Sequence, residues 1–361
     1  MLMPRKAVYI IAEAGVNHNG SKDLAFRLVD AAADAGADAV KFQTFNARKL
    51  ATREVEKAQY QTVNMHSTES QLEMLEKLEL PQAWHIELQH HARQRGIEFL
   101  STAFDEMSLQ FLQSLDLPVY KVPSGELTNA PLLWRFAKTG KPLIISTGMA
   151  TLSEIEMGLA VVTHALNEKE EPCSMEEVWR CWGSVHARDK LLHHVTLLHC
   201  TSQYPTPWDE VNLRAMDTLA SAFSLPVGYS DHTEGTVIPI AAVARGACVI
   251  EKHFTLDRSL PGPDHLASID VPELKQLVSA IRALETALGH GYKAPQASEW
   301  SVRRVARQSI ITAKHIQVGQ VIERDDLTTA RAGSGCSPDL LWQVIGTVNR
   351  KEYEPGEVFE L

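Results

Sequence analysis

One pattern constrains the fold of this chain most: a short apolar run, a polar end and an amphipathic segment, repeated eight times. In residues 227–254, one extended run ends in Ser230-Asp231-His232, an apolar helical segment follows, and the next run ends in Glu251-Lys252-His253. Eight such units are typical of a closed parallel barrel and not of an open sheet. We predict an α/β fold, a (β/α)8 TIM barrel over residues 1–288, with strands over 8–12, 39–42, 98–101, 119–122, 143–145, 195–198, 227–229 and 249–250.

Two segments interrupt the repeat inside the barrel. A polar loop over 46–67 is long enough to be a lid or binding loop. A charged insertion over 167–194 falls between the fifth helix and the sixth strand. That position places it on the amino face of the barrel, away from the face where barrel enzymes carry their chemistry. We predict a helical interaction or packing element there.

The pattern of apolar and polar residues changes after the barrel. Residues 289–298 look like a linker, and residues 299–361 contain short β-like runs separated by turns. One pattern of apolar residues around a glycine occurs twice, at 316–322 and 353–359. A domain of this size is marginal alone, so we predict a small β-rich domain that leans on another surface.

Composition limits the partners and the compartment. The net charge is −10, and no run of Lys and Arg suggests a nucleic-acid groove or a membrane-facing patch. The five cysteines form no C-x-x-C pair, which favours free thiols in a reducing compartment. The first residues lack the apolar run of a signal peptide, and no segment is apolar for long enough to span a membrane. We therefore expect a cytoplasmic protein.

Polar side chains cluster at the predicted strand ends, which share one rim of such a barrel. Two lysines with several hydroxyls suit a phosphate or carboxylate, and two imidazoles suit Mn²⁺, Co²⁺ or a similar ion. Glu13 is a candidate general base, although Glu13 and Lys41 could also form an interior ion pair without a chemical role. No G-x-G-x-x-G follows the first strand, so a dinucleotide site has no support. The pattern predicts a metal-dependent enzyme acting on a phosphorylated anion, with a rim formed by Glu13, Lys41, Thr102, Lys121, Ser124, Glu126, Ser146, Ser202, Tyr204, Ser230, His232 and His253.

Ten ordered motifs carry a resemblance to a known family. They are AEAGVNHNG, VKFQT, ESQLEMLEKLEL, STAFD, YKVPSGELTN, STGM, CTSQYPTP, GYSDHT, EKHFTLD and PGPDH. Together they resemble the sialic acid synthase family, and the tail is similar to the antifreeze-like (SAF) domain of those enzymes. The resemblance implies condensation of phosphoenolpyruvate with an N-acyl-hexosamine and water, with C–O cleavage and release of phosphate. N-Acetylmannosamine, giving N-acetylneuraminate, is the first expectation; a 2,4-diacetamido-6-deoxyhexose, giving legionaminate or pseudaminate, is the alternative.

The resemblance also implies roles for individual residues. His232 and His253 match ligands of a divalent metal, Mn²⁺ first and Mg²⁺ or Co²⁺ otherwise, and Glu13 matches the acid/base. The phosphoenolpyruvate site would contain Lys41, Lys121, Ser124, Ser146, Ser230, Thr102 and Asn64. The sugar site would contain Glu126, Tyr204 and Asp264, with Ser202 where some members have Asn. Arg331 matches a residue that the tail inserts into a partner's active site, which implies a domain-swapped homodimer, while Ala332 and Cys336 depart from the usual R-P-G-x-G-I loop.

Other functions remain open from the residues alone. Another phosphoenolpyruvate-condensing barrel would make a seven- or eight-carbon sugar acid, and a Schiff-base aldolase could use Lys121. A metal hydrolase would be expected to carry a His-x-His pair after its first strand, where this chain has Glu13 and Asn-His-Asn. A non-catalytic sugar-binding or ice-binding protein is the rival outside the enzymes.

Overall fold

The computed structural model describes residues 7–52 and 70–361. Internal contacts divide the chain into two compact units, Met1–Gly289 and His290–Leu361. None of the described helices combines the length and the apolar composition that crossing a membrane requires. All five cysteines are free thiols, as their number and spacing predict.

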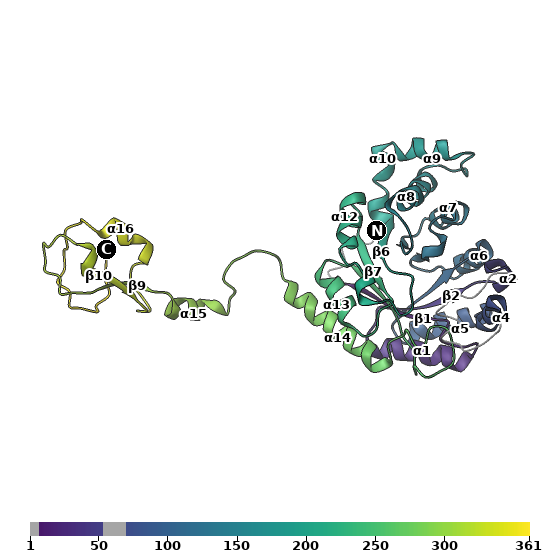
Figure 1. Cartoon of the computed structure of the whole chain (residues 1–361), viewed down its shortest axis with the longest axis horizontal. Coiled ribbons are helices and arrows are strands. Elements are labelled where there is room, and N and C mark those ends of the chain that lie inside the picture. Colours follow the sequence, from purple (N-terminus) through teal and green to yellow (C-terminus); the bar gives the residue numbers. More distant parts are fainter. Residues whose placement is uncertain (1–6, 53–69) are drawn as a thin grey trace. The chain divides into compact units, whose positions relative to one another are not determined.

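The first unit is a closed barrel of eight strands in sequence order, with helices around it (Figure 1). Every neighbouring pair is parallel, including β1 with β8, so the predicted closed parallel barrel is confirmed. The strands are β1 (Tyr9–Gly15), β2 (Ala39–Thr44), β3 (Glu98–Ala103), β4 (Tyr120–Val122), β5 (Leu143–Ser146), β6 (Val195–His199), β7 (Val227–Asp231) and β8 (Val249–His253).

Helices follow the strands where capping residues and apolar periodicity predict them. Ser21 accepts a hydrogen bond from Leu24 N at the start of α1, and Gly36 ends that helix with a left-handed φ of 80°. The helices around the strands are α1 (Lys22–Ala35), α2 (Ala47–Leu50), α4 (Gln71–Leu78), α5 (Gln82–Gln94), α6 (Glu106–Ser114), α7 (Ala130–Lys138), α8 (Leu152–Asn167), α12 (Ala215–Phe223), α13 (Val237–Ala244) and α14 (Val271–Leu288), with 3-10 turns η1 (Ser124–Glu126) and η2 (Trp208–Glu210).

The barrel interior has two layers. Alternate residues of a strand face opposite sides of the sheet, so residues two apart share a face. An apolar layer fills the amino-terminal part of the interior: Tyr9, Ile11, Ala39, Leu100, Val119, Ile144, Leu198 and Val249. Two positions further along the same strands, the same face carries polar residues: Glu13, Lys41, Thr102, Lys121, Ser146 and Glu251. The alternation of side chains along the strands therefore places a polar layer next to the apolar layer, on its carboxyl-terminal side.

The insertion is helical, as its composition predicts. It contains α9 (Met175–Trp182), α10 (Val185–Arg188) and α11 (Leu191–His194), and α9 packs against α8. Trp182 Nε1 donates to Glu156 Oε1 at 3.0 Å, which ties the insertion to α8. Because these helices lead into the start of β6, they lie at the amino end of the strands.

The second unit is small and has its own core. It contains α15 (Glu299–Ala306), an antiparallel pair β9 (Ser309–Thr312) and β10 (Leu327–Ala330), 3-10 turns η3 (Arg324–Asp326) and η4 (Pro338–Leu340), and α16 (Leu341–Val344). The repeated pattern forms part of this core, because Ile316, Ile322, Tyr353 and Phe359 are all buried. The two repeats also pair with each other, through hydrogen bonds between Ile316 and Tyr353 in both directions at 3.0 Å.

Candidate active site

Charged side chains of different strands meet at the carboxyl end of the barrel interior. Lys41 Nζ lies 2.7 Å from Glu13 Oε2 and 3.5 Å from Glu251 Oε2, and it donates to Thr102 Oγ1 at 2.9 Å. Lys121 Nζ lies 3.6 Å from Glu251 Oε1. None of these five residues exposes more than 5% of its surface. The Glu251 carboxylate thus stands between two ammonium groups in a water-poor interior.

Serine hydroxyls complete this buried ring. Lys121 donates to Ser146 Oγ at 2.6 Å, and Ser230 donates to Glu251 Oε1 at 2.8 Å. Ammonium and hydroxyl donors close together are the groups that bind phosphate and carboxylate oxygens. The structure therefore brings together five residues that the sequence predicts for an anion site: Lys41, Thr102, Lys121, Ser146 and Ser230.

The protonation of the two glutamates differs sharply. Burial raises the pKa of Glu13 to about 7, despite the attraction of Lys41. Burial also opposes ionisation of Glu251, but Lys121 and Lys41 outweigh it and lower the pKa of Glu251 to about 2. Burial lowers the pKa of Lys121, whereas for Lys41 the two carboxylates outweigh burial and raise the pKa. Near neutral pH, Glu251 is a fixed anion and Glu13 can exchange a proton.

Sequence reasoning missed Glu251 as a member of the site and noted it only as a neighbour of the second imidazole. The alternation of side chains along a strand could have revealed it. Glu251 lies two positions before His253 on β8, so both side chains face the same side of the sheet. Its central position depends on register, which pairs Ser230 with Glu251 across β7 and β8.

The two predicted imidazoles lie side by side. The ring centroids of His232 and His253 are 5.6 Å apart, and the Tyr204 ring lies 4.1 Å from that of His232. His232 Nδ1 donates to the Thr201 carbonyl at 2.7 Å, so its Nε2 keeps a lone pair. Within the described residues His253 Nδ1 is buried without a hydrogen-bond partner, and it lies 3.9 Å from Asp264 Oδ2.

Both imidazoles are suited to hold a metal ion. Burial lowers the pKa of His232, and burial together with His232 and Lys41 lowers the pKa of His253, so both rings are neutral near pH 7. In residues 7–52 and 70–361, no group of three or more His, Cys, Asp or Glu side chains could hold a metal ion. The pair therefore fits an open site in which water or substrate oxygens supply the other ligands.

A third group of polar atoms lies where β4, β5 and β6 end. Ser124 Oγ accepts from Gly148 N at 3.0 Å and lies 3.2 Å from Cys200 Sγ. A Cβ at Gly148 would come 2.8 Å from Ser124 Oγ and would overlap Ser202 Oγ. The absence of a side chain at Gly148 leaves room for both hydroxyls, so Ser124 and Ser202, both predicted from the sequence, lie beside this glycine.

The other predicted residues lie around or beyond this centre. Asp264 follows β8 and is 8% exposed, and burial raises its pKa to about 6. The Glu126 carboxylate accepts from Asn129 Nδ2 at 2.6 Å. Arg331 lies in the second unit, exposed, directly after β10. Asn64 lies outside the described residues.

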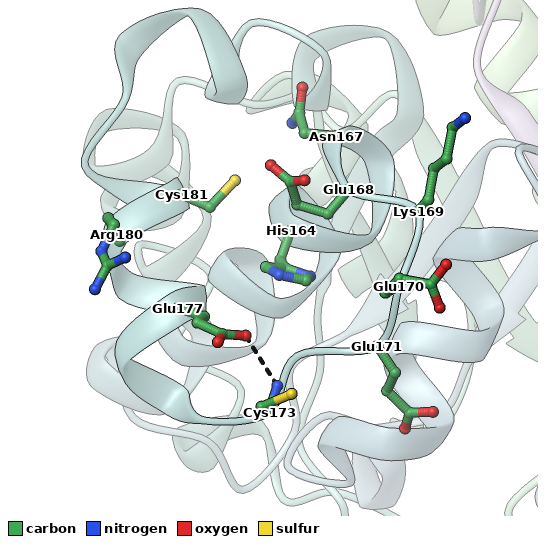
Figure 2. A pocket seen from close by; sticks show the side chains of 10 residues that line it. All are labelled: His164, Asn167, Glu168, Lys169, Glu170, Glu171, Cys173, Glu177, Arg180 and Cys181. Carbon is green, nitrogen blue, oxygen red and sulfur yellow. Dashed lines mark hydrogen bonds between the residues drawn. The ribbon is translucent and has the colours of Figure 1, made fainter.

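A cavity of about 810 Å³ lies at the other end of the barrel, between α8 and the insertion (Figure 2). Its walls carry His164, Lys169 and several glutamates, and Cys173 and Cys181 also line it. Most of these charged side chains are exposed. The predicted strand-end residues do not line this cavity.

The carboxyl end of the barrel gathers buried charges that compensate one another, an arrangement that adds little to stability over apolar packing. The fold is a (β/α)8 barrel, and the buried lysines and hydroxyls at its carboxyl end are groups suited to an anion. Comparison with known proteins makes the class specific: the chain belongs to the NeuB family, whose model matches residues 28–293.

Similar proteins cover almost the whole chain. N,N'-diacetyllegionaminic acid synthase of Legionella pneumophila is 48% identical, covering 94% of this chain and 89% of its own. The Campylobacter jejuni protein of the same name is 45% identical, with 98% and 99% covered. The crystal structure of N-acetylneuraminic acid (sialic acid) synthetase from Leptospira borgpetersenii has a TM-score of 0.65 and 34% identity, covering 81% of this chain and 89% of its own. The chain is thus an enzyme, a phosphoenolpyruvate-dependent transferase of the sialic acid synthase type.

Proposed function

We propose that this enzyme condenses phosphoenolpyruvate with a 2,4-diacetamido-6-deoxyhexose and water to give a legionaminate-type nine-carbon acid and phosphate. Identity of 48% and 45% to two N,N'-diacetyllegionaminic acid synthases, against 34% to an N-acetylneuraminic acid synthetase, supports this sugar. The alternative expectation from the sequence therefore fits better than N-acetylmannosamine. The observation that carries the chemistry is the buried ring of lysines and hydroxyls beside two neutral imidazoles.

The buried ring is the proposed phosphoenolpyruvate site. Lys41 and Lys121 would offset the charge of the phosphate and carboxylate, and Thr102, Ser146 and Ser230 would orient their oxygens. Their side chains already lie within hydrogen-bond distance of a neighbour in the ring, so little reorganisation is needed when an anion replaces those contacts. Ser124 would extend this site, as would Asn64.

The proposed reaction forms one carbon–carbon bond and breaks one carbon–oxygen bond. C3 of phosphoenolpyruvate attacks the aldehyde carbon of the open-chain sugar, whose oxygen takes a proton, and water adds at C2. Phosphate then leaves with the bridging oxygen, which yields the 2-keto acid. Glu13 is the proposed proton carrier, because a pKa of about 7 lets one carboxyl group accept and return a proton in each turnover.

His232 and His253 are the proposed ligands of a divalent ion, Mn²⁺ first. Bound there, such an ion would polarise the aldehyde oxygen and orient the sugar. Two observations support this assignment: His253 Nδ1 is buried and has no hydrogen-bond partner in the part of the chain that the structure describes, and both rings are neutral. Glu126, Tyr204, Ser202 and Asp264 are the proposed sugar-binding residues around the pair.

We further propose that the second unit is an antifreeze-like domain that completes a partner's active site in a homodimer. Arg331 is exposed and follows β10 directly, a position from which it can serve another surface. Arg331→Ala should therefore lower kcat/KM while the melting temperature stays within about 2 °C of the unmodified enzyme, since exposed substitutions change stability little. Unchanged kinetics in that variant would count against an exchanged tail.

A substrate panel tests the proposed reaction. Phosphate release from phosphoenolpyruvate is measured with Mn²⁺ and one of four sugars: the legionaminate precursor, its pseudaminate stereoisomer, N-acetylmannosamine or N-acetylmannosamine 6-phosphate. We expect the highest kcat/KM with the legionaminate precursor, and ¹⁸O from the bridging position should appear in the phosphate. A higher kcat/KM with another sugar would overturn the sugar assignment, and no phosphate release with any sugar would overturn the reaction.

A further inference from the structure

A second pair of charges lies on the opposite face of the same two strands. Lys252 and Asp231 each sit one position away from an inward-facing residue of β8 or β7, so they point outward toward the helices. Lys252 Nζ lies 2.6 Å from Asp231 Oδ2, and neither side chain has any exposed surface. The two residues are also partners in the β7–β8 register.

Lys252 fixes the chain on both sides of the first imidazole. Its ammonium group donates to Asp231, directly before His232, and to the carbonyl oxygen of Thr233, directly after it. Asp231 Oδ1 also accepts from Thr233 N at 3.0 Å, which closes a tight turn around His232. Lys252 therefore binds the residue before His232 and the residue after it.

The same lysine is adjacent to the second imidazole. His253 follows Lys252 directly on β8, and its backbone is fixed by Ile269 N, which donates to His253 O at 3.0 Å. One ammonium group thus links the strand that carries His253 to the turn that carries His232. Lys252 is therefore connected to both rings through the backbone segments that carry them.

We infer that Lys252, with Asp231 as its partner, is a positioning residue that sets the geometry of the His232–His253 pair and so its affinity for a divalent cation. Stability alone does not explain the pair, because apolar residues of similar volume usually stabilise an interior as well as a buried ion pair does. Residues that orient metal ligands typically change metal affinity by about 10- to 100-fold when they are replaced. This inference rests on the metal site of the proposed function.

The test uses a variant in which no unpaired charge is left inside the protein. Asp231→Asn combined with Lys252→Met removes the ammonium bridge but keeps a side-chain oxygen for Thr233 N. The control is Asp38→Asn with Arg282→Met, which removes another 2.6 Å ion pair, partly exposed, between α14 and the start of β2 at the amino end; Arg282 also pairs with Glu285. Lys252→Met alone serves as a second test variant. Circular dichroism and melting temperature establish that each protein is folded.

Two affinities are measured on full-length, metal-free protein: Mn²⁺ by electron paramagnetic resonance of the free ion, and phosphoenolpyruvate by calorimetry. We expect the double variant to bind Mn²⁺ about 10- to 100-fold more weakly, with phosphoenolpyruvate affinity within about 2-fold of the unmodified enzyme. The control pair should bind Mn²⁺ as the unmodified enzyme does. Weaker Mn²⁺ binding by the single variant Lys252→Met would support the same conclusion.

The outcomes separate this inference from the proposed function. Normal Mn²⁺ affinity in both Lys252 variants would overturn the inference and leave the proposed metal site intact. Equal losses of Mn²⁺ and phosphoenolpyruvate affinity, or an equal loss in the control pair, would also overturn it, since they indicate general damage to the barrel. If the unmodified enzyme binds no Mn²⁺ and His232→Ala changes nothing, the proposed metal site itself fails.

Discussion

The two ends of the barrel unit use the same kinds of side chain in different ways. At the carboxyl end, Lys41, Lys121 and Glu251 are buried and meet across strands that are far apart in the sequence. In the insertion cavity the charged groups are exposed, and Arg180 pairs with Glu176, four residues before it on α9. Long-range pairs in a dry interior have fixed geometry, whereas local pairs in water are easily replaced by solvent. Composition of a cavity is therefore a weaker guide to function than the origin and burial of its charges.

The largest expected difference between the two ends is in their histidines. His232→Ala should abolish metal-dependent turnover while the fold survives, because the ring is a proposed metal ligand and its hydrogen bond to the Thr201 carbonyl is a single interaction. His164→Ala, in the insertion cavity, should leave kcat and KM unchanged. Initial rates are measured with metal-free protein and added Mn²⁺. Full activity of metal-stripped His232→Ala would remove the metal site from the mechanism.

The next largest difference is expected between a lysine at the carboxyl end and a lysine of the insertion cavity. Lys121→Met removes a buried ammonium group from the proposed anion site, and we expect kcat/KM to fall by about 10²- to 10³-fold, the usual effect of losing one preorganised donor. Lys169→Met removes an exposed charge from the insertion cavity and should leave kcat/KM unchanged. Steady-state kinetics with varied phosphoenolpyruvate measures both variants. Equal effects of the two substitutions would contradict the contrast between the two ends.

How much the sequence reveals also differs between regions. Eight apolar runs and the caps at Ser21 and Gly36 predict the strands and the first helix, because local periodicity and capping determine them. Glu251 could not be placed between the two lysines from local pattern alone, since that requires the registers of several strands. The positioning role of Lys252 depends on the same information, because only register shows that it faces Asp231.

The buried His85 should make the stability of the protein sensitive to acid. Burial lowers the pKa of His85 from 6.5 to about 4, while its ring nitrogens contact Thr44 Oγ1 and the Pro81 carbonyl. On acidification the unfolded chain binds a proton at His85 before the folded protein does. The free energy of unfolding is therefore at its full value above pH 6.5 and decreases as the pH falls toward 4. Between pH 7 and pH 4.5 this one group should lower the free energy of unfolding by about 2 kcal/mol.

Urea unfolding at these two pH values measures the effect. His85→Gln should be less stable at pH 7 but should lose less stability on acidification than the unmodified protein. His193→Gln, in the exposed part of the insertion, is the control for replacing a histidine by glutamine at the surface. An unchanged pH dependence in His85→Gln would mean that other groups cause the acid sensitivity.

The smallest effect belongs to the surface of the insertion. Arg180 and Glu176 lie 2.9 Å apart, but their side chains are 75% and 81% exposed, so water and salt screen the pair. Arg180→Ala should therefore change the free energy of unfolding by less than about 0.5 kcal/mol, and Glu176→Ala should do the same. Urea unfolding in low and high salt measures both, with the double variant closing the cycle. A loss above about 1 kcal/mol would show that the insertion holds its charges as rigidly as the barrel interior does, and the distinction between the two ends would then rest on metal and anion binding alone.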